Sequence, residues 1–160
     1  MNQRICKYRL LIFAAALMIL LAGQVYPAGA AVTPIRVPAN VEWVSTGIWL
    51  ESGQTVYLSA EGLAITGSIR WFFASRSGPA GQVWGLGCGQ YEAAPPPCAL
   101  DDAPYGALIG RVGPDGEPFL IGGASSFVAP VSGYLYLVVN DNLGFYNDNL
   151  SGFTVILAGK

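Results

Sequence analysis

Residues 138–157 read VVNDNLGFYNDNLSGFTVIL, and this stretch says more about the fold and its use than any other part of the sequence. Two apolar runs of the kind found in β-strands flank a segment crowded with Asn, Asp and Gly. The residue chemistry alone fits two structures. One is an ordinary hairpin loop, because these residues are common in turns. The other is a group of oxygen ligands around a calcium ion, with Gly144 letting the backbone turn so that its carbonyls point inward.

Similar strand-like runs recur along the chain, separated by Gly, Pro, Asn and Asp. No segment of helical period is found in residues 31–160, and Pro114-Asp115-Gly116 predicts a hairpin between two of the runs. We therefore expect an all-β chain, a jelly-roll β-sandwich of about eight strands. The runs cover residues 41–50, 55–62, 68–75, 106–113, 118–123, 126–133, 133–140 and 152–159.

The aromatic residues in these runs allow two interpretations. They could stack against sugar rings, or they could fill the core of the sandwich. Because they lie in alternating runs, we expect the core for all of them: Trp43, Trp49, Trp71, Phe72, Tyr134 and Tyr136.

The N-terminus has the layout of a secretory signal peptide over residues 1–30. Three basic residues precede an apolar run at 10–23, and small residues at 28–30 form a cleavage site. A retained membrane anchor is the alternative, but this run is shorter than the roughly 20 residues needed to span a bilayer. We expect cleavage, a single domain over residues 31–160, no stable membrane anchor, and a secreted or periplasmic location.

Charge and composition exclude several classes of function. Removal of residues 1–30 takes away three of eight basic residues and no acidic one, which leaves a formal charge of −5. An acidic chain without a basic cluster does not fit nucleic acid. The absence of His removes the usual general base. The adjacent Asp101 and Asp102 would point to opposite faces of an extended chain, unlike the facing carboxylates of a glycosidase. A non-catalytic protein is the better prediction.

Two cysteines, Cys88 and Cys98, remain after residues 1–30 are removed. An even pair in an exported chain predicts one disulfide, which closes the loop GCGQYEAAPPPCA. Free thiols or a metal pair are the alternatives. A tetrahedral zinc site would lack soft ligands, because the chain has no His and only these two cysteines.

Several segments together resemble the bacterial galactophilic lectin family called PA-I, whose members are small jelly-roll sandwiches. In chain order they are VSTGIWLESGQTVYLSAEG, SGPAG, GALIGRVG and VVNDNLGFYNDNLSGFTVIL. The resemblance covers most of residues 41–158. It is most specific in the last segment, which matches a D-x-x-G-x-Y-x-[ND]-N-x-x-G pattern without gaps.

The resemblance implies one bound Ca²⁺ and a carbohydrate held through it. The calcium ligands would be the side chains of Asp141, Asp148 and Asn149 and the backbone carbonyls of Phe145 and Thr66. Sugar hydroxyls would complete the calcium shell and accept or donate hydrogen bonds at the same polar side chains. The implied sugar-binding residues are Asp141, Asn142, Asp148, Asn149 and Gln90. Members of the family assemble as tetramers, so the resemblance also implies a homo-oligomer.

The chain departs from the family pattern at the sugar side of the site. The family uses a His and a Gln after the Gly-Pro turn, whereas this chain has no His and carries a longer, proline-rich loop there. Asp148 stands where the type member has Asn, and Thr66 where it has Tyr. Calcium binding therefore carries over better than a preference for galactose. The competing hypothesis is a secreted structural or interaction module in which calcium is absent or only orders the loop.

Overall fold

The computed structural model describes residues 34–67, 75–82, 88 and 97–158. The predicted signal peptide, Gln90, and all but the last residue of the predicted strand at 68–75 lie outside these residues, so these three remain predictions. In the described part of the chain no helix is both long and apolar enough to cross a membrane.

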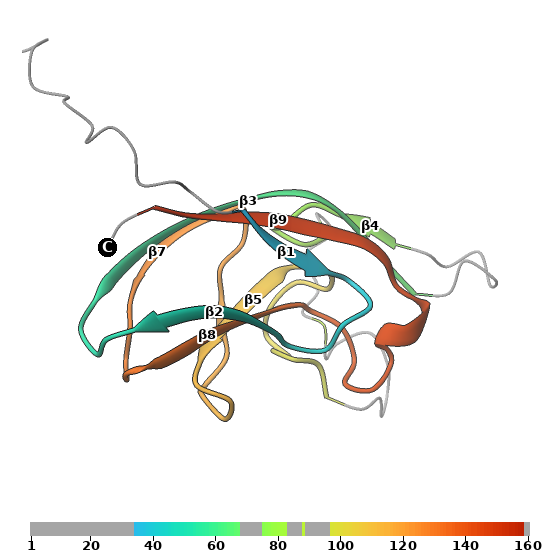
Figure 1. The fold of residues 1–160 in the computed structure, drawn as a ribbon. Coiled ribbons are helices and arrows are strands. Elements are labelled where there is room, and N and C mark those ends of the chain that lie inside the picture. The colour runs from blue at the N-terminus through green and yellow to red at the C-terminus, as the bar shows by residue number, and fades with distance from the viewer. Residues whose placement is uncertain (1–33, 68–74, 83–87, 89–96, 159–160) are drawn as a thin grey trace, which may run out of the picture. The chain divides into compact units, whose positions relative to one another are not determined.

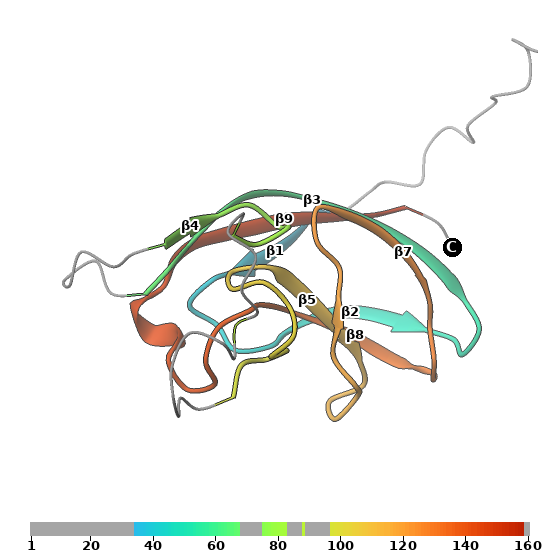
Figure 2. The ribbon, with the colours of Figure 1, turned by 180° about the vertical axis from the view of Figure 1, so that it is seen from behind.

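The described chain forms two antiparallel sheets that face each other as two layers (Figures 1 and 2). One sheet has the order β1-β9-β3-β4, with β7 also paired to β3, and the other has the order β2-β8-β5-β6. The bounds are β1 Ile35–Pro38, β2 Val44–Leu50, β3 Thr55–Thr66, β4 Ser75–Ser77, β5 Leu108–Val112, β6 Phe119–Leu120, β7 Ala124–Val128, β8 Gly133–Val139 and β9 Leu150–Ala158. The predicted all-β sandwich is confirmed, and β1 is a strand that the sequence patterns did not predict.

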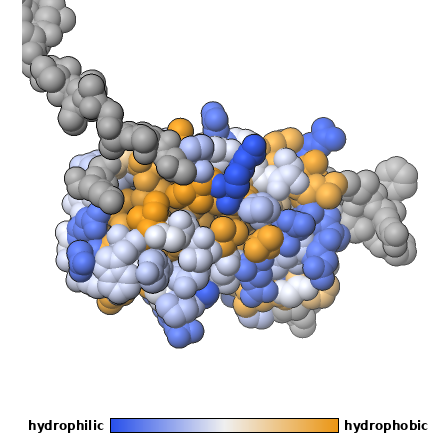
Figure 3. Space-filling model, viewed as in Figure 1, coloured by the Kyte–Doolittle hydropathy of each residue, from blue (hydrophilic) through white to orange (hydrophobic). Residues whose placement is uncertain are grey.

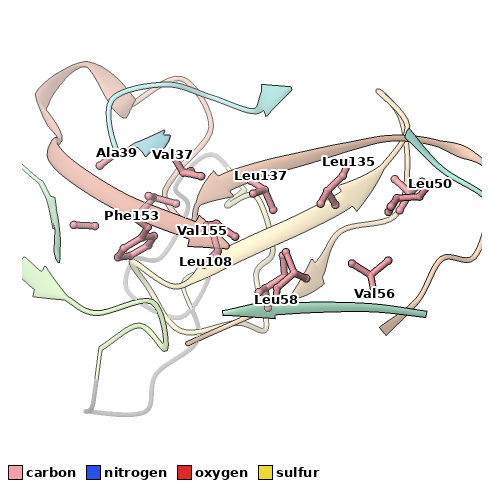
Figure 4. Close-up of a cluster of buried hydrophobic side chains, with 14 of the residues drawn as sticks. Val37, Ala39, Leu50, Val56, Leu58, Leu108, Leu135, Leu137, Phe153 and Val155 are labelled. Atoms are coloured by element: carbon pink, nitrogen blue, oxygen red, sulfur yellow. The ribbon is translucent and has the colours of Figure 1, made fainter. Parts of the chain in front are cut away.

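Alternation along the strands places the core between the two sheets. Val56 and Leu58 of β3 face Leu135 and Leu137 of β8 across the interior, and all four are buried (Figure 4). Burying a side chain of this size stabilises the fold by roughly 1.5–3 kcal/mol. The Pro114-Asp115-Gly116 turn joins β5 to β6 as expected, since these two strands pair antiparallel. In Figure 3 hydrophobic residues gather between the two layers, and the surface over β2 and β8 is paler.

A second, smaller apolar cluster lies on the outer side of the β2-β8-β5-β6 sheet. Val138 of β8 and Ile109 of β5 point away from the main core and pack against Ala99, Ala103 and Ala107. The segment 97–107 therefore covers one end of the outer face of this sheet.

The core prediction is wrong for the four of these aromatic residues that the structure describes, because none of them lies in the core between the sheets: Trp43, Trp49, Tyr134 and Tyr136. Trp49 is 50% exposed and Tyr134 is 47% exposed. Both occupy outward positions of paired strands, and the segment 97–107 does not cover that part of the sheet. Alternation divided the residues correctly between two faces, but the outer face also carries aromatic rings.

Candidate functional site

The loop of residues 140–149 passes from one sheet to the other. β8 pairs with β2 and β5, whereas β9 pairs with β1 and β3, so the two strands that flank the loop do not pair with each other. The loop turns at Gly144, whose φ of 85° favours glycine, and then forms a 3-10 turn over Tyr146–Asp148. The ordinary-hairpin interpretation of residues 138–157 is therefore wrong.

Asn140 opens the loop and has a structural role. Its side chain is completely buried; its Oδ1 accepts a hydrogen bond from the Leu100 N–H, and its Nδ2 donates to the Leu100, Ala103 and Pro104 carbonyls. The Asn140 backbone also bonds to Gly106 and Ala107. These contacts fasten the start of the loop to segment 97–107.

The Asp141 carboxylate lies at the centre of the site and is only 1% exposed. Its Oδ1 accepts hydrogen bonds from the Tyr105 hydroxyl at 2.6 Å and from the Asn142 N–H at 2.7 Å. Its Oδ2 accepts one from the Asn149 Nδ2 at 2.7 Å. The backbone carbonyl of Asp141 also accepts two hydrogen bonds, from the Ala99 N–H and from the Tyr146 hydroxyl. Asp141 is thus fixed in position by neighbours from three parts of the chain.

Asn149 joins Asp141 to the ends of two other strands. Its buried amide donates from Nδ2 to the Ala39 carbonyl, just after β1, as well as to Asp141. Its Oδ1 accepts from the Gly67 N–H, just after β3. These opposite demands on the two ends of the amide fix its orientation.

The electrostatics around Asp141 favour a positive charge that the described residues do not supply. Burial raises the pKa of Asp141 above its ordinary value, its three hydrogen bonds lower it, and the negative charge of Asp148 raises it again. No Arg or Lys is among the groups that shift this pKa. Burial, followed by Asp141 itself, also raises the pKa of Tyr105, so that Tyr105 remains a protonated donor.

Thr66, at the end of β3, lies beside this group with an unused polar atom. Its side chain is completely buried, and its Oγ1 meets no hydrogen-bond partner, although it is near enough to the Tyr105 hydroxyl to lower the pKa of that group. Gly106, with a φ of 74°, leaves room here, because a Cβ would approach Ser77 Oγ and come within 3.9 Å of Thr66 Oγ1.

The remaining predicted ligands lie on the exposed side of the loop. Asp148 and Phe145 are exposed, and Asp148 is close enough to act electrostatically on Asp141. Asn142 is half-buried, and its Nδ2 lies 3.6 Å from Cys98 Sγ. The structure thus brings Asp141, Asn149 and Thr66 together, with Asp148 at the rim.

Tyr105 is the member of this group that sequence reasoning missed. It lies 36 residues before Asp141, in a segment without strand pattern. The expected disulfide is present between Cys88 and Cys98. It closes the segment that leads to Tyr105, and the backbone of this segment bonds to the loop through Leu143 N–H and the Pro97 carbonyl. A proline-rich disulfide loop placed before a lone Tyr was the available signal.

The donor set fits a hard cation such as calcium. A carboxylate offers about four acceptor positions, and the described bonds to Asp141 use three of them. Asn149 Oδ1 accepts one bond and retains a second lone pair. The described residues contain no group of three or more His, Cys, Asp or Glu side chains, so a cation here would depend on amide, hydroxyl and backbone oxygens, which calcium accepts.

Comparison with known proteins agrees with the fold. No protein-family model and no curated protein matches the chain. Among solved structures, the N-terminal domain of EclA, described as a PllA-like lectin, matches with a TM-score of 0.61. The two chains are 23% identical over 82% of this chain and 100% of that domain. The chain shares the fold of that lectin domain. The resemblance to lectins in the sequence is therefore confirmed at the level of the fold.

Proposed function

We propose that the protein is a secreted, calcium-dependent carbohydrate-binding protein that recognises galactose-like or related sugars at the 140–149 loop. The observation that carries this proposal is the buried Asp141 carboxylate, which has a second carboxylate nearby and no cationic partner among the described residues. A buried charge of this kind is costly unless it is paired or binds a metal ion. The shared fold with a lectin domain supports the carbohydrate part of the proposal.

Each residue of the site would have a distinct task. Asp141, Asp148 and Asn149 would hold the ion with their side chains, and Phe145 and Thr66 with their carbonyls. Tyr105 and the Asn142 N–H would keep the Asp141 carboxylate oriented through the hydrogen bonds described above. When bound, calcium would neutralise the two carboxylates and offer open positions to vicinal sugar hydroxyls. Asn142 and Gln90 would contact the sugar directly.

Calorimetric titration of the purified protein with CaCl₂ tests the metal part. We expect binding heat in the wild type, none in Asp141→Ala, and roughly tenfold weaker binding in Asp148→Asn, which keeps an oxygen but loses a charge. Asp115→Asn, in the exposed β5–β6 turn, is the matched control and should bind as the wild type does. Because Asp148 is exposed, its variant should fold even where Asp141→Ala does not. Absence of calcium heat in the wild type would contradict the proposal.

A glycan array separates the lectin from the competing module. Both carboxylate oxygens of Asp141 already accept hydrogen bonds without an ion, and this favours an interaction module in which the loop is only structural. Signal on any glycan with calcium, lost when EDTA is added, supports the lectin. Calcium heat together with a blank array supports the module. The same proposal includes a homo-oligomer, which rests on the family resemblance. It also includes the lack of catalysis, which rests on the absence of His.

A further inference from the structure

A row of aromatic side chains runs along the outer face of the β2-β8-β5-β6 sheet, and at its Trp43 end it reaches the apolar cluster that also contacts Leu143 of the 140–149 loop. We call it the aromatic strip. Its members are Trp49 and Tyr134 at one end and Trp43, Arg111 and Tyr136 towards the middle of the sheet.

The strand register places these side chains next to one another. Trp49 lies opposite Tyr134 across β2 and β8, and Arg111 lies opposite Tyr136 across β5 and β8. Tyr134 and Tyr136 are two residues apart on β8 and therefore point to the same side of the sheet. The outward residues of β2 between the two ends are Ser45 and Gly47, which have no large side chains.

The rings of the strip are already held in place. Trp49 and Tyr134 meet edge to face, with ring centroids 5.1 Å apart and an angle of 83°. The Trp49 indole Nε1 donates to Glu51 Oε1 at 2.9 Å, and the Ser132 hydroxyl donates to Glu51 Oε2 at 3.0 Å. Binding of a partner here would therefore cost little side-chain conformational entropy in the protein, since Trp49 and Tyr134 are already held in one arrangement.

The Arg111 guanidinium completes the strip. Its Cζ lies 4.0 Å from the Trp43 ring centroid and 5.5 Å from that of Tyr136. Its Nε is buried and has no hydrogen-bond partner among the described residues. The guanidinium thus remains a charged donor between aromatic rings.

The outer face of the opposite sheet has a different composition, although one exposed aliphatic residue, Leu120 of β6, also lies on the face that carries the strip. The large apolar residues exposed on the outer side of β3 and β9 include the aliphatic Leu63, Leu150 and Ile156 together with Tyr57. Polar groups accompany the rings of the strip, with Glu51 and Ser132 beside Trp49 and with Arg111 between Trp43 and Tyr136. Rings with polar groups beside them suit a ligand that is apolar on one face and hydroxylated at its edge.

We propose that the aromatic strip is a second carbohydrate-binding surface, which takes the pyranose units of a glycan chain and needs no calcium. The C–H bonds on a pyranose face carry partial positive charge, and the face of an aromatic ring is negative, so the two attract each other. Arg111 donates to a ring hydroxyl or to the carboxylate of an acidic sugar, and Glu51 accepts from hydroxyls at the other end. This proposal does not depend on calcium binding at the 140–149 loop.

Affinity electrophoresis in native gels tests it, with EDTA present throughout so that the loop plays no part. The gels contain galactomannan, xyloglucan, hyaluronate or polygalacturonate, two neutral and two acidic polysaccharides. We expect at least one to retard the wild type. We expect Trp49→Ala and Tyr134→Ala to weaken the apparent affinity about tenfold or more, as for the loss of one stacking ring. Tyr57→Ala, an equally exposed Tyr on the opposite sheet, is the matched control and should be retarded as the wild type is.

Three results would overturn the proposal. The first is no retardation by any of the four polysaccharides. The second is retardation that Trp49→Ala leaves unchanged or that Tyr57→Ala also abolishes. The third is a dimer in analytical ultracentrifugation that Trp49→Ala dissociates, with no polysaccharide binding, which would make the strip a contact between copies of the chain. The acidic polysaccharides could retard the protein more strongly than the neutral ones, with this difference reduced in Arg111→Gln. That result would show that Arg111 binds the carboxylate of an acidic sugar.

Discussion

The 140–149 loop follows strand β8 and the aromatic strip includes two of its residues, yet the two regions are held in different ways. The two buried side-chain atoms without a hydrogen-bond partner in the described chain lie one at each region, Thr66 Oγ1 beside the loop and Arg111 Nε in the strip. Around Asp141 the polar groups are buried and bonded to backbone from distant segments. In the strip two of the rings, Trp49 and Tyr134, are exposed and depend on few neighbours. A substitution of a buried residue of the loop should therefore affect folding, whereas one in the strip should affect binding far more than stability.

The largest effect is expected from Asn149→Ala, which tests how far the loop depends on its buried amide. The change leaves the Ala39 carbonyl, the Gly67 N–H and one Asp141 oxygen without their partner. Each unsatisfied buried group costs about 1–3 kcal/mol, so we expect a loss of about 3 kcal/mol or more in the free energy of unfolding. Urea denaturation measures it. A loss below about 1 kcal/mol would show that the loop is not held through this amide.

The double change Cys88→Ser and Cys98→Ser should have the next largest effect. The disulfide joins residues ten positions apart, and on the chain-entropy model it stabilises the fold by about 3 kcal/mol at most. Because the closed segment leads to Tyr105, we also expect weaker calcium binding in calorimetry. Retardation by polysaccharide in EDTA should not change. A parallel loss of both activities would mean that the two regions are not independent.

Tyr105→Phe should produce a moderate effect that depends on calcium. The change removes the 2.6 Å hydrogen bond to Asp141 and retains the ring. A hydrogen bond to a charged group contributes about 1.5–3 kcal/mol, so the calcium-free variant should melt at a lower temperature than the wild type. Saturating CaCl₂ should narrow this difference, because the ion takes over part of the charge compensation. An equal difference with and without calcium would exclude such compensation.

Trp49→Ala should have the smallest effect on stability. Half of this side chain is exposed, and its edge-to-face contact with Tyr134 contributes about 0.5–1.5 kcal/mol. We expect the free energy of unfolding, measured by urea denaturation, to fall by about 1 kcal/mol or less. Retardation by polysaccharide should fall strongly in the same variant. A loss as large as that of Asn149→Ala would show that Trp49 serves the fold rather than a ligand.

The same contrast explains what the sequence could and could not predict. The strands followed from alternation, and the polar cluster of the loop followed from a dense local motif around Asp141 and Asn149. The role of Tyr105 could not be predicted, because its contact with Asp141 depends on the path of a segment 36 residues away. The exposure of Trp49 and Tyr134 could not be predicted either, since alternation assigns residues to two faces without saying which face another segment covers. β1 is only four residues long and too short for a recognisable pattern.

Strand β8 also sets the distance between the aromatic strip and the 140–149 loop. Tyr134 lies near its start and Asp141 two residues past its end, with seven residue steps between them. The five steps that lie within the strand, from Tyr134 to Val139, span about 17 Å at about 3.3 Å per extended residue. Because the strand is paired on both sides, by β2 and β5, this spacing is rigid. A branched or long glycan that engaged both positions would be held at two points of one molecule, and the second contact would form at a high effective concentration set by the strand rather than by assembly of several chains.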